Sequence, residues 1–116
     1  MATYEVNDAA VKAARRLIDD GRYDTTTEWS DAAPSTSAEN DVIDARGYDG
    51  YGEWHLAIDT EASEETKGRY RFPYGDFERV NRAALIHAKQ RASQNDHDDV
   101  AEAADSLLEH LDRTDG

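Results

Sequence analysis

The chain has 116 residues and a formal net charge of −13, from 26 acidic and 13 basic residues. It contains no cysteine, which excludes disulfides, thiolate metal sites and cysteine nucleophiles. No apolar run approaches the ~20 residues that a membrane-spanning helix needs. The first residues also lack the basic-then-apolar pattern of a signal peptide. These features predict a single domain over residues 1–116, located in the cytoplasm and not in a membrane.

The kind of acidity is informative as well as its amount. Asp outnumbers Glu by 16 to 10, and Arg outnumbers Lys by 10 to 3. At ~1 M salt the Debye length is about 3 Å, so the repulsion among these charges is largely screened. The composition therefore predicts a halophilic, acidic protein. Because the hydrophobic fraction is only 38%, the core of one chain is small. Burial of apolar surface against a second subunit would add stability, which favours a homo-oligomer.

The first predicted element is a helix over residues 8–20, where apolar side chains recur at three- and four-residue spacing. Asn7 or Asp8 can cap its start, and Gly21 stands where a left-handed residue commonly ends a helix. In the connection that follows, Trp29 is expected to plug the core over the helix ends.

The middle of the chain alternates between helical and extended patterns. A second helix is predicted over residues 35–46, with its end at Gly47, and the glycine-rich residues 48–52 indicate a turn. Residues 54–59 alternate apolar and polar side chains, which favours a short strand. Residues 69–72 alternate basic and aromatic side chains and could pair with that strand.

The C-terminal part predicts two further helices. The longer covers residues 77–94 with Asp76 as its cap, and the last runs over about residues 99–111. Since the break between them is short, we expect them to pack antiparallel. Residues 113–116 are expected to form a frayed tail. The fold class is therefore mainly α, a small domain of about four helices, with a short β hairpin as an α+β variant.

Charge is distributed unevenly along the chain. Residues 67–94 hold seven basic and two acidic residues, a net charge of +5, so the remainder carries −18. Arginines that hold phosphates, with aromatic rings under bases, are typical of sites for nucleotides and RNA. We call residues 67–94 the basic-aromatic segment. Its candidate binding residues are Arg69, Tyr70, Arg71, Phe72, Tyr74, Arg79, Arg82, Lys89 and Arg91.

Two uses of the basic-aromatic segment remain open. The leading hypothesis is a non-enzymatic interaction or binding module that self-associates through it, with its arginines paired to acids of the same chain or of a second subunit. The alternative is an accessory protein that binds RNA or a phosphate-bearing ligand such as a nucleotide. Five phosphate contacts would lose about four to five decades of affinity between ~0.15 M and ~3 M salt, so stacking would have to dominate.

A second alternative is a small enzyme built on His55 with the nearby carboxylates of Glu53 and Asp59. Such a pair on a strand face is more often surface decoration.

His87 is expected at an interface, and the acidic run 96–99 is interpreted as a helix start, not a metal site. The histidines lack the spacing of metal motifs, so we predict no catalytic residue, metal or cofactor.

Four runs carry a resemblance to a known family. They are EWHLAID at residues 53–59, ETKGRY at 65–70, FPYGDFERV at 72–80 and ALIHAKQRA at 84–92. Together they resemble a family of small proteins from extreme halophilic archaea, with similar relatives in bacteria and no established function. The resemblance implies a salt-adapted protein of the cytoplasm, and it assigns no role to any residue.

Overall fold

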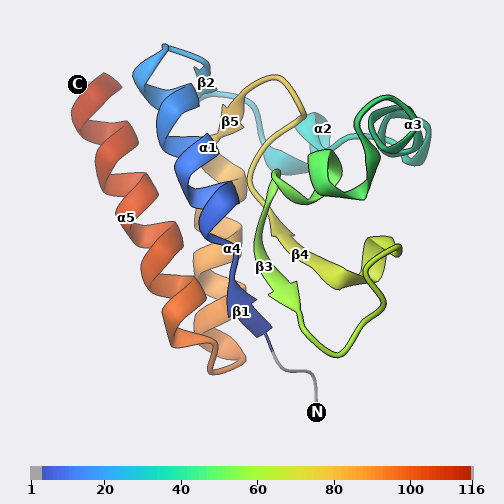
Figure 1. Cartoon of the computed structure of the whole chain (residues 1–116). Helices are drawn as coiled ribbons and strands as arrows, with labels where there is room; N and C mark the ends of the chain where they lie inside the picture. The colour runs from blue at the N-terminus through green and yellow to red at the C-terminus, as the bar shows by residue number, and fades with distance from the viewer. Residues whose placement is uncertain (1–3, 116) are drawn as a thin grey trace.

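Three helices pack side by side against one face of a small antiparallel sheet, in a computed structural model that describes residues 4–115 (Figure 1). The elements in chain order are β1 (Tyr4–Val6), α1 (Asp8–Asp19), β2 (Tyr23–Asp24), α2 (Trp29–Ala32), α3 (Thr36–Gly52), β3 (His55–Asp59), the 3₁₀ turn η1 (Lys67–Arg69), β4 (Tyr70–Pro73), β5 (Val80–Asn81), α4 (Arg82–Gln94) and α5 (Asp98–Asp115). Within these residues, α1, α3, α4 and α5 each have at least 12 residues. The predicted mainly α fold with a small β component is confirmed.

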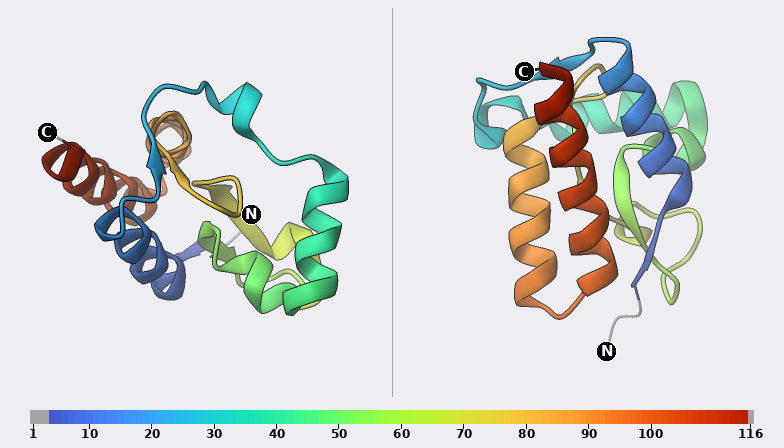
Figure 2. Two further views of the ribbon diagram at one scale, coloured as in Figure 1. Left: turned by 90° about the horizontal axis from the view of Figure 1, so that it is seen from above. Right: turned by 90° about the vertical axis from the view of Figure 1, so that its left-hand side faces the viewer.

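The sheet has the strand order β1-β3-β4, and both pairs are antiparallel. The predicted pairing of the two alternating runs is confirmed, because β3 and β4 are neighbours. Helices α1, α4 and α5 lie on one side of this sheet, and α3 lies away from them beyond its other side (Figure 2). The expected antiparallel packing of the last two helices is also observed, since α4 and α5 run in opposite directions (Figure 2).

The core is built largely from small and branched side chains. From α1 it receives Ala10, Ala14 and Ile18, all with no exposed surface. The inward stripe of α5 lies as the sequence predicts, with Leu107 and Leu111 also fully buried. Alanine allows helices to approach closely, and each fully buried leucine contributes roughly 1.5–3 kcal/mol through the hydrophobic effect.

Strand β3 is buried along both faces at its start, which the alternating pattern did not predict. Leu56 faces the helices with no exposed surface, but His55 is only 5% exposed and Ala57 is fully buried. The reason is topological, because β3 is the central strand and the end of α3 covers its second face, with Tyr51 against His55. The expectation that His55 decorates the surface is therefore wrong.

Helix α4 begins five residues later than predicted. The Asp76 carboxylate accepts hydrogen bonds from the backbone N–H groups of Glu78 and Arg79 and closes a turn, not a helix. The cap is Asn81, whose Oδ1 accepts from the N–H of Ala84 at 2.9 Å. Arg79 consequently lies outside α4.

Two further boundaries differ from expectation. Helix α5 continues through Asp115, so the expected frayed tail is helical up to that residue, and the Thr114 hydroxyl donates to the carbonyl of His110. Arg113 in the last turn complements the negative end of the helix dipole. In α3 the backbone breaks at Gly47, with φ of 75°, and the residues beyond it resume a helix where a turn was expected.

Candidate functional site

The structure distributes the basic-aromatic segment over several places. Two of its basic residues are paired with acids of the same chain across the α4–α5 seam. Arg82 Nε lies 2.8 Å from Asp112 Oδ1, and Lys89 Nζ lies 2.7 Å from Asp105 Oδ1. The hydrogen bond from Arg82 lowers the pKa of Asp112. Pairing within the chain, one of the uses expected for these cations, is observed for both.

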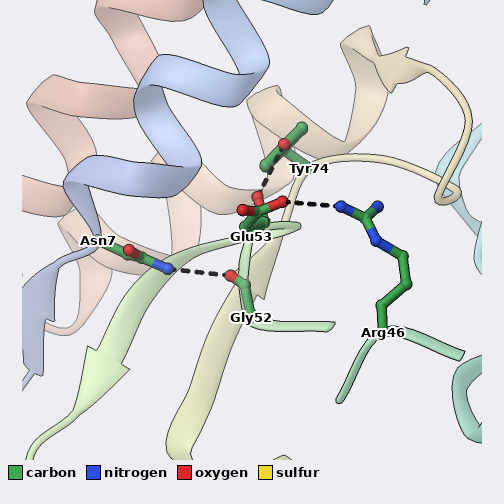
Figure 3. A network of polar contacts seen from close by, with 5 residues as sticks. All are labelled: Asn7, Arg46, Gly52, Glu53 and Tyr74. Atoms are coloured by element: carbon green, nitrogen blue, oxygen red, sulfur yellow. Dashed lines mark hydrogen bonds and ion pairs between the residues drawn. The ribbon is translucent and has the colours of Figure 1, made fainter. Parts of the chain in front are cut away.

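Tyr74, a predicted binding residue, lies in the core and not on a binding surface. It is fully buried, stacks on Trp54 with ring centroids 5.2 Å apart, and donates its hydroxyl hydrogen to the carbonyl of Glu53. Figure 3 shows this contact together with two others. Arg46 forms an ion pair with the Glu53 carboxylate, and Asn7 donates a hydrogen bond to the carbonyl of Gly52. Burial raises the pKa of Tyr74, so it stays a neutral donor. This network fixes the point where α3 enters β3 and where β4 ends.

Three other members of the basic-aromatic segment lie at separate places in the structure. Arg69 donates from Nη1 to the carbonyl of Ala62 at 3.0 Å. The Tyr70 ring is half-buried and lies 6.2 Å from that of His55. Arg79 is exposed and borders a shallow hollow together with Arg22.

Three predicted residues do come together. Arg71, Phe72 and Arg91 border a hollow between β4 and α4 with a volume of about 400 Å³, which we call the β4–α4 pocket. Its full lining is Tyr4, Trp29, Arg71, Phe72, Pro73, His87, Ala88, Arg91, Asn95 and His97. These residues come from β1, α2, β4, α4 and the loop before α5.

Aromatic rings form one wall of the β4–α4 pocket. The rings of Tyr4 and His97 lie 4.4 Å apart and tilted by 31°, and the Phe72 ring meets Tyr4 edge-on at 6.0 Å. The Arg71 guanidinium lies 5.9 Å from the centre of the Tyr4 ring, within the range of a cation–π contact. The wall thus offers flat apolar surface beside a cation.

The pocket is cationic in an acidic chain. Its charge comes from Arg71 and Arg91, and no acidic side chain is among its lining residues in the described part of the chain. Arg71 uses Nε for the carbonyl of Gly68 at 3.1 Å, which leaves its terminal N–H groups for a ligand. Within residues 4–115 the Arg91 guanidinium forms no ion pair. The site therefore holds positive charge that the chain itself does not neutralise.

Phe72 carries backbone strain inside the pocket. Its φ is 62°, a left-handed conformation that costs a bulky residue roughly 1–3 kcal/mol. The strand pairs on either side hold it in place, because Ala57 is paired with Arg71 and His55 with Pro73. Strain of this kind concentrates at ligand sites, which supports the pocket as the functional surface.

The sequence did not point to most of this lining. Trp29, expected to plug the core, is half-buried and forms part of the pocket wall, so that expectation is wrong. His87 and His97 were interpreted as interface and helix-start residues, and Tyr4 was not singled out. Because the lining comes from five separate stretches, spacing along the chain carries no signal for it.

The residues of the enzyme hypothesis are not assembled. His55 Nδ1 contacts the carbonyl of Tyr51 at 3.0 Å and not a carboxylate, and burial lowers its pKa to about 4. Glu53 pairs with an arginine, and the Asp59 carboxylate accepts the N–H of Glu61. The hollow that His55 borders contains neither Glu53 nor Asp59.

No protein-family model, curated protein or solved structure matches this chain. In residues 4–115, no helix combines the length and the apolar character required to cross a membrane. The same residues contain no group of three or more His, Asp or Glu side chains that could hold a metal ion. The β4–α4 pocket is therefore the feature from which we infer a function.

Proposed function

We propose that this protein is a non-enzymatic binding module whose β4–α4 pocket takes a small phosphate-bearing ligand with a planar ring, of the nucleotide class. The observation that carries the proposal is the convergence of Arg71 and Arg91 with aromatic side chains in one hollow without acidic lining. Guanidinium groups bind phosphate oxygens through paired, charge-assisted hydrogen bonds. The rings of Tyr4, Phe72 and Trp29 supply surface for stacking a base.

The size of the pocket favours a small ligand over a nucleic-acid chain. A volume of about 400 Å³ falls within the range of roughly 300–1,000 Å³ common for small-molecule sites. Two arginines border the pocket, whereas Arg82 and Lys89 are paired on α4 with acids of α5. Stacking, at about 1–3 kcal/mol per base, persists in molar salt where phosphate contacts weaken.

The test is a titration with adenosine 5′-monophosphate (AMP) in ~3 M KCl, followed by tryptophan fluorescence. We expect saturable quenching, because Trp29 borders the pocket. Arg71→Glu and Arg91→Glu should each weaken binding by at least about tenfold. Each change replaces a guanidinium that donates hydrogen bonds to the phosphate with a carboxylate that repels it. Arg15→Glu is the matched control, because it makes the same charge change on the exposed face of α1.

Equal affinities for all three variants would contradict the proposal, as would no response to AMP at any concentration. A titration with single-stranded RNA separates the alternatives. Tighter binding of RNA than of AMP, with the same loss in Arg91→Glu, would replace the small-ligand assignment by an RNA-binding one.

Three further proposals rest on the sequence. Self-association through the basic-aromatic segment stays a prediction, and Arg79, exposed beside Arg22, is the member of the segment best placed for it. A working environment of molar salt is proposed from the balance of Asp over Glu and Arg over Lys. A place in the cytoplasm is proposed from the sequence and from the halophilic resemblance.

A further inference from the structure

A second hollow adjoins the β4–α4 pocket. It has a volume of about 140 Å³ and shares Trp29 and Pro73 with that pocket. We call it the His55 hollow. Its lining residues are Trp29, Ala33, Pro34, Glu39, His55, Pro73, Gly75 and Phe77. Because Trp29 and Pro73 border both spaces, the two hollows are neighbours, and a ligand that reaches His55 from the pocket has to pass these two side chains.

The contact of His55 with the backbone fixes which ring nitrogen is free. Its Nδ1 lies 3.0 Å from the carbonyl of Tyr51, and a carbonyl only accepts, so Nδ1 carries the proton. Nε2 is then an acceptor, and it forms no hydrogen bond within residues 4–115. Every fully enclosed polar side-chain atom in that part of the chain has a partner, so Nε2 is not fully enclosed, and the His55 hollow is the space that this side chain borders.

The surroundings of His55 keep it neutral and fixed in place. Burial lowers its pKa to about 4, so Nε2 remains an acceptor at neutral pH. The Tyr51 ring lies 4.5 Å from the imidazole, and the Tyr70 ring lies 6.2 Å away. Glu39, the acid in the same hollow, is occupied by Lys67 Nζ at 3.2 Å and by the hydroxyl of Tyr51.

We propose that His55 is a specificity-determining residue whose Nε2 accepts a hydrogen bond from an N–H or O–H group of the ligand. This inference rests on the proposed function, and it narrows the ligand to a nucleotide whose base carries an outward amino group. A base without that donor would cover the Nε2 lone pair and leave it unsatisfied. The volume of the His55 hollow fits such a group and the ring edge that bears it.

The test compares two probes that differ at one position. AMP carries an amino group at purine C6, and purine riboside 5′-monophosphate carries hydrogen there. In ~3 M KCl we expect the wild-type protein to bind AMP about tenfold more tightly. His55→Asn can keep a donor to the carbonyl of Tyr51 but lacks the outer acceptor, so it should bind both probes alike.

His55→Gln is the matched rescue, because its longer side chain returns a carbonyl oxygen close to the Nε2 position. It should recover part of the preference for AMP. Far-ultraviolet circular dichroism and thermal melting establish that both variants fold. If the wild type binds both probes equally, or if His55→Asn keeps the preference for AMP, the role of His55 is overturned. The proposed function is not overturned by either result. No binding of either probe would overturn the proposed function and this assignment with it.

Discussion

His55 couples folding to pH through its burial. It is only 5% exposed, and desolvation lowers its pKa from 6.5 to about 4. The unfolded chain therefore binds a proton more readily, and folding loses stability as pH falls below about 6.5. The penalty stops growing below about pH 4, where the folded state also takes up the proton. Between pH 7 and pH 5 the loss is about 2 kcal/mol.

Urea unfolding at pH 7 and pH 5 measures this loss. In His55→Asn the side chain does not titrate, so the stability difference between the two pH values should shrink by about 2 kcal/mol. Hydrogen bonds from Thr27 and Thr26 lower the pKa of Asp24 to about 2, so this carboxylate remains ionised over the range and does not contribute. An identical pH dependence in wild type and variant would show that folding does not change the pKa of His55.

Individual site residues were predictable only in part. Arg71, Phe72 and Arg91 could be selected because a local excess of basic and aromatic residues is visible in the chain. Arg82, in the same segment, faces an acid 30 positions away on another helix, which local composition does not show. Trp29 lies in a connection whose position depends on tertiary contacts, so its place in the pocket wall had no local signal.

At the scale of elements, α1 and α4 end with the same hydrogen-bond pattern but with different residues. The N–H of Arg22 bonds the carbonyl of Leu17 at 2.8 Å, and the N–H of His97 bonds that of Ala92 at 2.8 Å. The left-handed residue is Gly21 in the first case, with φ of 77°, and Asp96 in the second, with φ of 62°. A residue with a Cβ is sterically strained in this conformation, whereas glycine is not.

Asp96→Gly should therefore raise the free energy of unfolding by about 0.5–1 kcal/mol, because it removes the strain and keeps the turn. Asp96→Ala is the control, since it removes the same charge but retains a Cβ. Thermal melting in ~3 M KCl, where surface charge is screened, should rank glycine above aspartate and alanine. If Asp96→Ala is as stable as Asp96→Gly, the effect is electrostatic and strain is not its cause.

Element boundaries were predictable where one signal stood alone. Helix α5 presents an uninterrupted apolar stripe, and its buried residues follow the predicted spacing. Ahead of α4, both Asp76 and Asn81 are good caps, and spacing along the chain cannot rank them. The pairing of Val80 with Tyr23 in the β2–β5 ladder draws these residues into a strand, so the helix starts at the later cap.

At the scale of the whole molecule, repulsion among like charges opposes the folded state. The chain carries −13 within principal extents of 40 × 32 × 24 Å, and the four ion pairs of its Lys and Arg residues within residues 4–115 all involve partly exposed side chains. Exposed pairs contribute about 0–1 kcal/mol each, which is too little to offset the excess of acids. At ~0.1 M salt the Debye length is about 10 Å, comparable with the radius of gyration of 13.2 Å, so like charges repel across the molecule.

We therefore expect the melting temperature to rise steeply between ~0.1 M and ~1 M KCl and then more slowly, because the Debye length falls to about 3 Å over that range. Circular dichroism at each salt concentration measures the transition. Sucrose at matched osmolality is the control, since it favours the compact state without screening charge. A melting temperature that is the same at ~0.1 M and ~1 M KCl, or that rises equally in sucrose, would mean that repulsion does not limit stability. The balance of Asp over Glu and Arg over Lys would then no longer indicate adaptation to molar salt.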